Sequence, residues 1–376
     1  MKIVVTGADG LIGFHARARL HALACAASFK GECAPHEVVR LDHAGFSDDV
    51  TLLSAISGAD AVLHFAGVNR GTMTEVETSN PDIARRLVDA CNAADSLPHI
   101  VYANSTHAVK DSPYGRSKRI AGDVLESLGG RYTNLILPHV FGEFARPGYN
   151  NVTATFIDAV IAGKVPEVNS KGQVELLYAG AAAQAAIDAV EKLHTGLVRP
   201  EGRPTLVTEL LDQLQSFHAN YNANIFPDVG DPHDLALFNS YRTTLYPDGF
   251  PRTLKVNTDA RGTLFEAVRG GGGGQTFLST TSPSITRGNH FHLSKVERFL
   301  VVQGEAIIRI RKVLCNDVWE YSVSGDNPAP VDMPSLHTHS IENVGNTPLL
   351  TLFWTHDLFD PASPDTYFDP VLRAQE

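Results

Sequence analysis

The sequence contains little cysteine, a deficit of positive charge and no long apolar run. Its four cysteines form no C-x-x-C pair, which excludes a disulfide framework and favours a reducing compartment. No apolar stretch is long enough to span a bilayer and no signal peptide precedes the first apolar run, so we expect a cytoplasmic protein. With 31 basic and 42 acidic residues, the net charge of −11 argues against general binding to nucleic acid or an anionic membrane.

The first half of the chain alternates short apolar runs with longer, Ala-rich stretches. A length of 376 residues, with 43% hydrophobic and 19% charged residues, is typical of a globular protein of two or three domains. Alternation of this kind predicts an α/β fold, a parallel sheet with helices on both faces. The predicted strands cover residues 3–6, 38–41, 61–65, 100–103 and 135–137, and the predicted helices cover residues 11–24, 81–94, 153–162 and 181–193.

The pattern changes near residue 250. Short β-like runs separated by Gly, Pro and Asn follow, which predicts a small antiparallel barrel or jelly roll. We expect the glycine run Gly270–Gly274 to form a flexible hairpin loop between two of these strands, and the Pro- and Asp-rich segment Asn224–Arg252 to join the domains. The predicted domains are therefore residues 1–245 and 250–376. The β-like runs cover residues 263–268, 276–280, 298–302, 306–311, 319–323 and 349–354.

A glycine-rich turn follows the first predicted strand and opens the first predicted helix. It contains Gly7, Gly10, Leu11, Ile12 and Gly13. Glycines at these places allow a tight turn, close approach of the backbone to a pyrophosphate, and close packing of helix on strand. The N-terminus of the following helix then faces the phosphates. The turn therefore predicts a dinucleotide site, with a sharp turn of purely structural use as the alternative.

A tyrosine and a lysine stand four residues apart, at Tyr114 and Lys118. On a helix this spacing puts both side chains on one face. An ammonium beside a phenol lowers the pKa of the phenol, which makes Tyr114 a usable proton donor or acceptor near neutral pH. Ser105, at the end of a β-like run, can hydrogen-bond a substrate oxygen, and Thr106 is the alternative for that role. Taken alone, the pair is equally compatible with a surface helix.

The end of the second predicted strand bears on the choice of nicotinamide cofactor. Asp42 stands there, where a carboxylate accepts the ribose 2′-OH and so favours NAD. Arg40 and Arg70 could instead contact a 2′-phosphate, and Asp42 could equally be a solvated loop residue. NADPH and NADH therefore both stay open as cofactors.

Three histidines and a glutamate in the second half have the spacing of a metal site. Side chains alternate along a strand, so His290 and His292 lie on one face, and Glu297 can return to that face after a turn. His339 supplies another imidazole from a distant segment, with His337 as a reserve ligand or base. This donor set suits a divalent ion such as Zn, Ni, Fe or Mn. For any single histidine, a hydrogen-bonded or exposed imidazole is the alternative.

The first half resembles the extended short-chain dehydrogenase/reductase family. The resemblance rests on the G-x-x-G-x-x-G turn, the upstream Ser, the Tyr-x-x-x-Lys pair and Phe65-Ala66-Gly67, which resembles the strand-end motif that lines the family's cofactor cleft. It implies a Rossmann-like fold in which Tyr114 is the acid/base, Lys118 holds the ribose and tunes Tyr114, and Ser105 polarises the carbonyl. The nicotinamide carries the hydride.

The second half resembles the cupin superfamily. The first cupin motif, H-x-H followed after four residues by Glu and after six more by Gly, is matched at every defining position from His290 to Gly304. The second motif is matched at His339 but has Leu336 where the family usually has Gly. The resemblance implies an all-β jelly roll in which His290, His292, Glu297 and His339 hold the metal.

Over nearly its whole length the chain resembles the CapF family of bifunctional capsule-biosynthesis enzymes, for example at Pro113-Tyr114-Gly115 and Gly288-Asn289-His290. This implies zinc in the cupin, a homodimer, and a UDP-2-acetamido-2,6-dideoxy-4-ketohexose as substrate. The cupin would epimerise C3 and the reductase would reduce the C4 ketone, giving UDP-2-acetamido-2,6-dideoxy-L-talose, a precursor of N-acetyl-L-fucosamine in surface polysaccharide. His337 and Tyr367 are candidate acid/base groups for the epimerisation.

Three other functions stay open at this point. The cupin could be a binding or dimerisation module beside an active reductase. The chain could also be another NAD-dependent nucleotide-sugar epimerase or dehydratase. A nucleotide-sensing scaffold without activity is a further alternative, against which the intact Ser105, Tyr114 and Lys118 argue.

Overall fold

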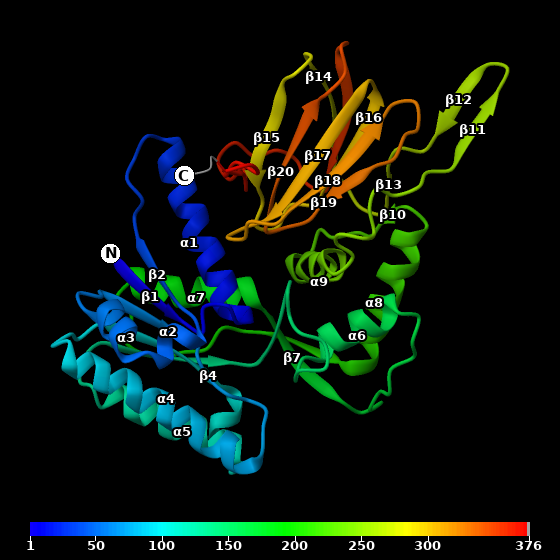
Figure 1. Cartoon of the computed structure of the whole chain (residues 1–376). Helices are drawn as coiled ribbons and strands as arrows, with labels where there is room; N and C mark the ends of the chain where they lie inside the picture. Colours follow the sequence, from blue (N-terminus) through cyan, green and yellow to red (C-terminus); the bar gives the residue numbers. More distant parts are fainter. Residues whose placement is uncertain (374–376) are drawn as a thin grey trace. The chain divides into compact units, whose positions relative to one another are not determined.

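The computed structural model describes residues 1–373, which divide into two compact units (Figure 1). The first unit comprises residues 1–155 and 168–208, and the second comprises residues 156–167 and the chain from residue 209 onward. Each unit has sheets of its own, so each is described separately.

A parallel six-stranded sheet forms the centre of the first unit. Its strand order is β2-β1-β3-β4-β5-β8, and every neighbouring pair is parallel. The order reverses between β1 and β3, and ligands of open α/β sheets bind in the crevice at the carboxyl ends of such strands. The strands are β1 Lys2–Thr6, β2 Glu37–Leu41, β3 Ala61–His64, β4 His99–Ser105, β5 Tyr132–Leu137 and β8 Gly196–Val198.

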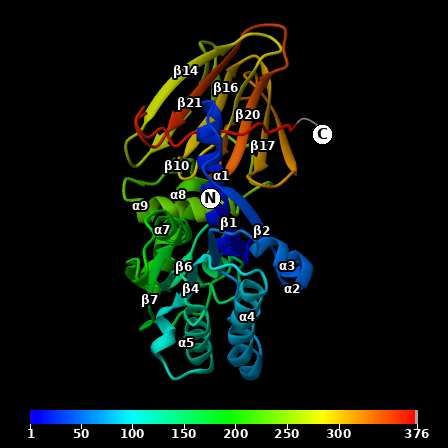
Figure 2. The ribbon, with the colours of Figure 1, turned by 90° about the vertical axis from the view of Figure 1, so that its left-hand side faces the viewer.

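Helices cover both faces of this sheet, as the alternating pattern predicts. Ile3 and Val5 pack with Leu20 on one face, whereas Val4 of the same strand packs with Leu87 on the other, because side chains alternate along a strand. Helices α4 and α5 lie side by side (Figures 1 and 2). The helices are α1 Leu11–Phe29, α2 His43–Ser47, α3 Asp49–Ile56, α4 Met73–Ala93, α5 Pro113–Glu126 and α7 Ala179–Glu191, with the 3-10 helix η1 Thr106–Val109.

A small sheet completes the first unit. Its strand order is β6-β7-β9, with β6 and β7 parallel and β7 and β9 antiparallel. Helix α6, Val152–Ile161, begins in the first unit and ends in the second. The three strands are β6 His139–Phe141, β7 Gln173–Tyr178 and β9 Arg203–Leu206.

Two antiparallel sheets dominate the second unit. Their strand orders are β14-β21-β16-β19 and β18-β17-β20-β15-β22. The predicted fold class, a Rossmann-like α/β half followed by an all-β half, is therefore confirmed. The strands are β14 Gln275–Thr281, β15 Thr286–Phe291, β16 Glu297–Gln303, β17 Glu305–Lys312, β18 Val318–Ser324, β19 Val331–Met333, β20 His337–Asn343, β21 Leu349–Thr355 and β22 Tyr367–Phe368.

The glycine run Gly270–Gly274 does not close the predicted hairpin. Strand β12, Gly262–Phe265, pairs with β11, Val256–Asp259, and β14 pairs with β21. The run instead continues β13, Arg269–Gly270, which pairs in parallel with β10, Ile225–Phe226. A Cβ on Gly274 would lie 2.4 Å from the carbonyl oxygen of Thr355, so close approach of two backbones requires glycine there.

The segment predicted to join the domains is instead packed structure. It contains β10 and helix α9, Pro232–Thr243, and together with α8, Val207–Asn222, it groups with the antiparallel sheets. The ring of Phe226 stacks on Trp354 with centroids 4.4 Å apart, and the hydroxyl of Tyr221 donates to Asp332 at 2.5 Å. The hydrogen bond and the ring stacking hold this segment in the second unit, which therefore begins earlier than the predicted boundary at residues 245–250.

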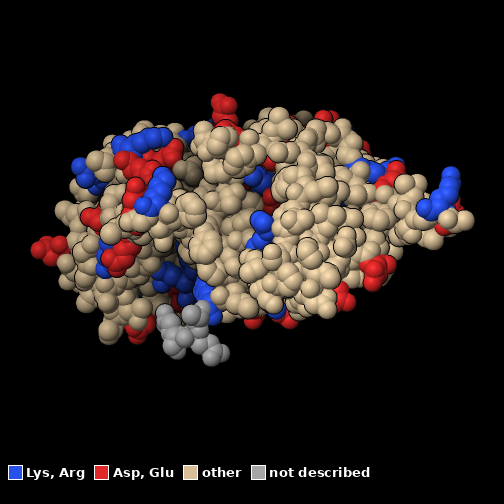
Figure 3. Space-filling view, turned by 90° about the horizontal axis from the view of Figure 1, so that it is seen from above, with Lys and Arg blue, Asp and Glu red and all other residues tan. Residues whose placement is uncertain are grey.

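Two features of the described residues concern a membrane and a nucleic acid as partners: the character of the helices and the distribution of surface charge. Among the described residues, no helix combines the length and the apolar character needed to cross a bilayer. Figure 3 shows Lys and Arg interspersed with Asp and Glu over the visible face, and not gathered into one basic patch.

Candidate functional site

The glycine-rich turn lies between β1 and α1 and forms a cradle of backbone. Gly7 has φ +61°, and a Cβ on it would lie 2.7 Å from the amide nitrogen of Ala66. A Cβ on Gly13 would lie 2.2 Å from the carbonyl oxygen of Gly7. Gly10 caps α1, whose first turn contains Leu11 and Ile12. The unpaired N–H groups at this helix N-terminus fit a pyrophosphate, so the donor set suits a dinucleotide.

The segment after β3, Phe65 to Gly67, packs against the same glycine-rich turn. The amide of Phe65 donates to the carbonyl of Thr6 at 3.3 Å, which continues the strand pairing past its end. A Cβ on Gly67 would lie 2.8 Å from Oδ1 of Asn80 and 3.9 Å from Nζ of Lys118. The structure therefore brings Phe65, Ala66 and Gly67 together with the glycine turn and with Lys118.

Asn80 is a residue of this site that the sequence analysis missed. Its buried amide accepts from the N–H of Val68 at 2.9 Å, donates to the carbonyl of Val68 at 2.8 Å, and donates to Oγ of Ser117 at 3.0 Å. It therefore ties the loop after β3 to helix α5. Asn80 lies on α4, which the sequence analysis predicted to begin at Pro81. The helix in fact begins at Met73, directly after Thr72, whose side chain forms a capping box with Glu75.

Ser105, Tyr114 and Lys118 converge at the end of β4. The side chain of Ser105 hydrogen-bonds the hydroxyl of Tyr114, whereas Thr106 opens the 3-10 helix. Nζ of Lys118 donates to the carbonyl of Ala103 at 2.6 Å and lies 4.1 Å from the ring centroid of Tyr102. The structure thus places Ser105, and not Thr106, in contact with the tyrosine.

The electrostatics of this cluster differ from the expectation. Burial raises the pKa of Tyr114, and the hydrogen bond with Ser105 only partly offsets that rise. Burial also lowers the pKa of Lys118 to about 7. The lowering of the Tyr114 pKa by Lys118 is therefore not seen in this structure, because the ammonium is directed to the Ala103 carbonyl and the Tyr102 ring.

Charged side chains surround the end of β2. Arg40 donates to both carboxylate oxygens of Asp9, at 3.0 and 2.5 Å, and lies 3.0 Å from Asp42. Arg17 also donates to Asp9 at 3.0 Å. Asp42 accepts from the N–H of Gly45 at 2.8 Å and so caps α2. Asp9, which belongs to the glycine turn, is a member of this network that the sequence analysis did not assign.

Arg70, the other predicted phosphate contact, lies elsewhere. It donates to the carbonyl of Gly148 and lies over the ring of Tyr149 at 5.7 Å from the centroid. No contact described for Arg70 involves Arg40 or Asp42, so the structure does not join it to the network at the end of β2.

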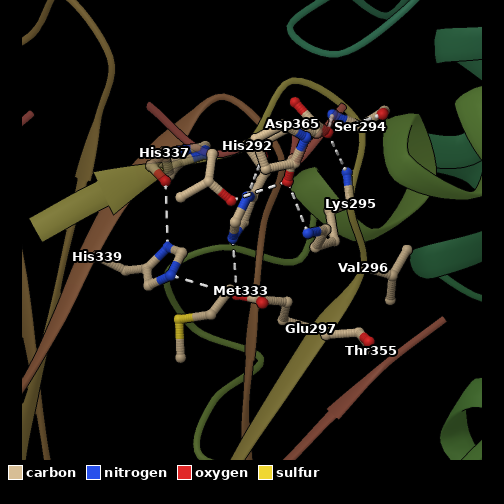
Figure 4. Close-up of polar contacts among 12 residues, drawn as sticks. His292, Ser294, Lys295, Val296, Glu297, Met333, His337, His339, Thr355 and Asp365 are labelled. Carbon is tan, nitrogen blue, oxygen red and sulfur yellow. Dashed lines mark hydrogen bonds and ion pairs between the residues drawn. The ribbon is translucent and has the colours of Figure 1, made fainter. Parts of the chain in front are cut away.

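The four predicted metal ligands come together in the second unit, and Figure 4 shows three of them, His292, Glu297 and His339. Their ligand atoms all lie within 4.8 Å of one another, and His290 on β15 stands opposite His339 on β20. Nε2 of His292 lies 2.8 Å, and Nε2 of His339 lies 3.4 Å, from the same oxygen of Glu297. Three imidazoles and one carboxylate in this arrangement fit a divalent ion of the zinc type.

The charge states of two cluster residues, His290 and Glu297, are also those of metal ligands. Burial lowers the pKa of His290 to about 3, and the neighbouring His339 and His292 add to this effect. Burial alone would raise the pKa of Glu297, but His292 and His339 together hold it well below its usual range. Metal binding requires a deprotonated carboxylate and imidazoles with a free lone pair, which are the forms favoured for Glu297 and His290.

The loop before His339 keeps a glycine-like backbone although it carries leucine. Leu336 is buried, has φ +59°, and donates its N–H to the carbonyl of His292 at 2.8 Å. A non-glycine residue in this region is strained and needs support from its surroundings. The left-handed backbone that glycine adopts most readily is therefore present here at a leucine.

The two predicted acid/base candidates occupy different surroundings. His337 is buried with its ring near those of Tyr246 and Trp319, at centroid distances of 6.1 and 5.6 Å, and burial lowers its pKa to about 3. It lies outside the four-residue cluster. Tyr367 is half-buried on β22, where it pairs with Phe291, the residue between two predicted ligands.

Comparison with known proteins identifies the family. Residues 3–199 match the NAD dependent epimerase/dehydratase family, and residues 257–367 match the polysaccharide biosynthesis C-terminal domain. UDP-2-acetamido-2,6-beta-L-arabino-hexul-4-ose reductase from Pseudomonas aeruginosa is 30% identical over 376 residues, with 98% of both chains covered.

Solved structures agree with this assignment. The capsular polysaccharide assembling protein CapF from Staphylococcus aureus is 30% identical with a TM-score of 0.59, covering 99% of this chain and 100% of that one. CapF with the inhibitor 3-isopropenyl-tropolone is 28% identical with a TM-score of 0.57 over the same shares. The chain therefore belongs to the NAD dependent epimerase/dehydratase family and, within it, to the CapF group, which joins this fold to a polysaccharide biosynthesis C-terminal domain.

Proposed function

We propose that this chain is a bifunctional nucleotide-sugar enzyme acting on a UDP-2-acetamido-2,6-dideoxy-4-ketohexose. The second unit inverts C3, and the first unit reduces the C4 ketone with NADPH or NADH. The product is UDP-2-acetamido-2,6-dideoxy-L-talose, for N-acetyl-L-fucosamine in capsular or O-antigen polysaccharide. The observation that carries the proposal is that one chain holds both the Ser105–Tyr114 pair beside a glycine-rich backbone cradle and a mostly buried cluster of three histidines and one carboxylate.

In the reduction, a bound nicotinamide supplies the hydride that C4 receives. Tyr114 donates its proton to the oxygen of the former ketone, and Ser105 hydrogen-bonds that oxygen and orients it. Lys118, with a pKa of about 7, is poised to exchange a proton near neutral pH and to contact the ribose. The backbone of Gly7–Gly13 binds the pyrophosphate.

In the epimerisation, the C4 ketone makes the C3 proton acidic, so a base removes it and an acid returns one to the opposite face. His290, His292, Glu297 and His339 would hold a divalent metal, with zinc the first candidate, and the metal would supply a positive charge that stabilises the enolate. Tyr367 is the leading acid/base candidate, because it is half-buried beside Phe291, whereas His337 is buried among aromatic rings.

A second candidate function keeps the reductase and makes the second unit a dimerisation module. Exposed apolar side chains favour it: Leu264 on β12 is 71% exposed, Leu278 on β14 is 63% exposed, and Phe277 is also exposed. Strands with exposed apolar side chains suit pairing with a second copy of the chain. A homodimer is compatible with either function.

One experiment separates the two functions. The full chain is incubated with a UDP-4-keto-6-deoxy-N-acetylhexosamine in deuterated water without nicotinamide. Deuterium at C3 supports the epimerase. Absence of deuterium, with NAD(P)H oxidation in a parallel incubation that contains NAD(P)H, leaves only the reductase with its dimerisation module. Absence of both reactions contradicts the proposal. Mass spectrometry of the sugar nucleotide reads the exchange directly.

A further inference from the structure

The carboxylate of Asp365 organises the loop that joins two of the predicted metal ligands. Its Oδ1 accepts from the N–H of Leu293 at 2.8 Å. Its Oδ2 accepts from the N–H and the hydroxyl of Ser294, both at 2.9 Å, and from the N–H of Lys295 at 3.0 Å. One side chain therefore binds three consecutive residues of the loop between His292 and Glu297, of which Figure 4 labels Ser294 and Lys295.

The main chain of the same residue orients His292. The carbonyl oxygen of Asp365 lies within hydrogen-bond distance of Nδ1 of His292. A carbonyl only accepts, so Nδ1 carries the proton, and Nε2 is the nitrogen directed at Glu297. A hydrogen bond on one ring nitrogen decides which nitrogen offers its lone pair to a metal, and such partners also raise the basicity of the ligand.

The segment that carries Asp365 is anchored on both sides. Nζ of Lys295 donates to the carbonyl of Pro364 at 2.9 Å. Beyond β22, the buried Arg311 lies 3.0 Å from Asp369 and donates to the carbonyl of Val371 at 3.0 Å. Asp365 itself has φ +42°, a conformation that surrounding contacts must hold in place. The segment is therefore a fixed support and not a loosely placed tail.

We propose that Asp365 is the positioning residue of the metal centre. Its carbonyl sets the tautomer and orientation of His292, and its carboxylate fixes the loop 293–295, so that His292 and Glu297 face each other before a metal arrives. The inference rests on the metal-binding part of the proposed function. The residue comes 73 positions after His292 in the chain and lies outside both cupin motifs.

The test measures zinc affinity of the full chain by competition with a chromophoric chelator, and the absorption spectrum of the cobalt-substituted protein. The variants are Asp365→Ala and Asp365→Asn, with Asp360→Ala as the matched control, because Asp360 is an exposed aspartate whose carboxylate accepts from the N–H of Ala362 within its own turn. Asp365→Ala keeps the main-chain carbonyl but removes the four carboxylate hydrogen bonds that fix this segment against the loop, so the carbonyl no longer has a fixed position against Nδ1 of His292. Loss of the outer support of a ligating histidine weakens metal binding about 10- to 100-fold. We expect this for Asp365→Ala, a smaller loss for Asp365→Asn, and wild-type affinity for Asp360→Ala.

The outcomes that overturn the inference are distinct. If wild type binds zinc and Asp365→Ala binds it equally tightly with an unchanged cobalt spectrum, the positioning role is wrong even if thermal stability falls. If wild type takes up no zinc, the metal centre of the proposed function is wrong instead. Should Asp365→Ala fail to fold, Ser294→Ala removes one of the four hydrogen bonds, and the inference then requires about a two- to tenfold weaker affinity.

Discussion

The two candidate sites differ in whether backbone groups or side chains form them. The site of the first unit consists largely of backbone: a glycine turn, the ends of β1 and β3, and the N-terminus of α1. The site of the second unit consists of buried side chains that strands β15, β16 and β20 and the residue after β15 bring within 4.8 Å. Backbone N–H groups suit an extended diphosphate, whereas converging imidazoles suit a single small ion.

The two sites also treat buried charge differently. Lys118 is buried with a carbonyl as its partner and without a carboxylate among its described contacts, so desolvation lowers its pKa to about 7. Glu297 is equally buried but lies between two imidazoles, which hold its pKa well below the usual range. A buried group keeps its charge when a partner compensates it and loses it otherwise. The first site is thus suited to proton transfer and the second to holding a cation.

The largest expected effect separates the two chemistries. Tyr114→Phe removes the proton donor of the reduction, so we expect kcat for NAD(P)H oxidation to fall about 10²- to 10⁴-fold. Deuterium exchange at C3, which depends on the second unit, should stay at the wild-type rate. Spectrophotometry at 340 nm and mass spectrometry measure the two reactions in one preparation. Persisting NAD(P)H oxidation would show that Tyr114 is not the donor.

The reciprocal experiment removes the cation site. The double variant His290→Ala, His292→Ala lacks two of four ligands, so its metal content should fall from about one ion per chain to a trace. C3 exchange should fall with it, because the enolate loses its nearest positive charge. Atomic emission on dialysed protein measures the metal. Retained stoichiometric metal would contradict the assignment of these ligands.

A pH experiment tests the uncompensated lysine. The pKa of Lys118 in the folded chain is about 7, below the unfolded value of about 10.4. Between these pH values the unfolded chain binds more protons, so this residue makes the free energy of unfolding rise with pH, by up to about 1.4 kcal/mol per pH unit. Below pH 7 both states are protonated and the contribution of Lys118 levels off.

Chemical denaturation at several pH values, without nicotinamide, measures this slope. Lys118→Met should lack the rise that wild type shows above pH 7. The control is Lys192→Met, at an exposed lysine that pairs with Asp188 at 2.7 Å, and it should keep the wild-type slope. Equal slopes for wild type and Lys118→Met would mean that Lys118 is not the uncompensated group.

The smallest expected effect concerns the choice of cofactor. Arg40 and Arg17 both donate to the carboxylate of Asp9. A 2′-phosphate that binds these arginines at the end of β2 would therefore be repelled by the negative charge of Asp9. Asp9→Asn removes that charge, and we expect kcat/KM for NADPH relative to NADH to rise several-fold. Asp82→Asn, at a surface pair with Arg85, is the control. An unchanged ratio would exclude Asp9 from cofactor selection.

The sequence predicts well whatever depends on neighbours in the chain. The glycine turn is set by φ angles that other residues disfavour, and the Tyr114–Lys118 spacing is set by the helix period. His290 and His292 share a face because side chains alternate along a strand, and the motif spacing placed Glu297 and His339 beside them. For the same reason the α/β half and the all-β half were distinguishable before the structure was known.

Other features depend on partners far away in the chain. Asn80 on α4 donates to Ser117, and Asp365 binds a loop about seventy residues earlier. Neither contact follows from the spacing of residues along the sequence. The directions of the Tyr114 and Lys118 pKa shifts follow from burial, which only packing creates. Likewise, α8 and β10 join the antiparallel sheets through the hydrogen bond of Tyr221 to Asp332 and the stacking of Phe226 on Trp354, which no local sequence pattern predicts.

Local conformational preference therefore accounts for the turns, the helix faces and the strand alternation of this protein, since these arise within a few residues. Burial, the charge state of Lys118 and Glu297, and the support of His292 by Asp365 arise only when distant segments exclude water together.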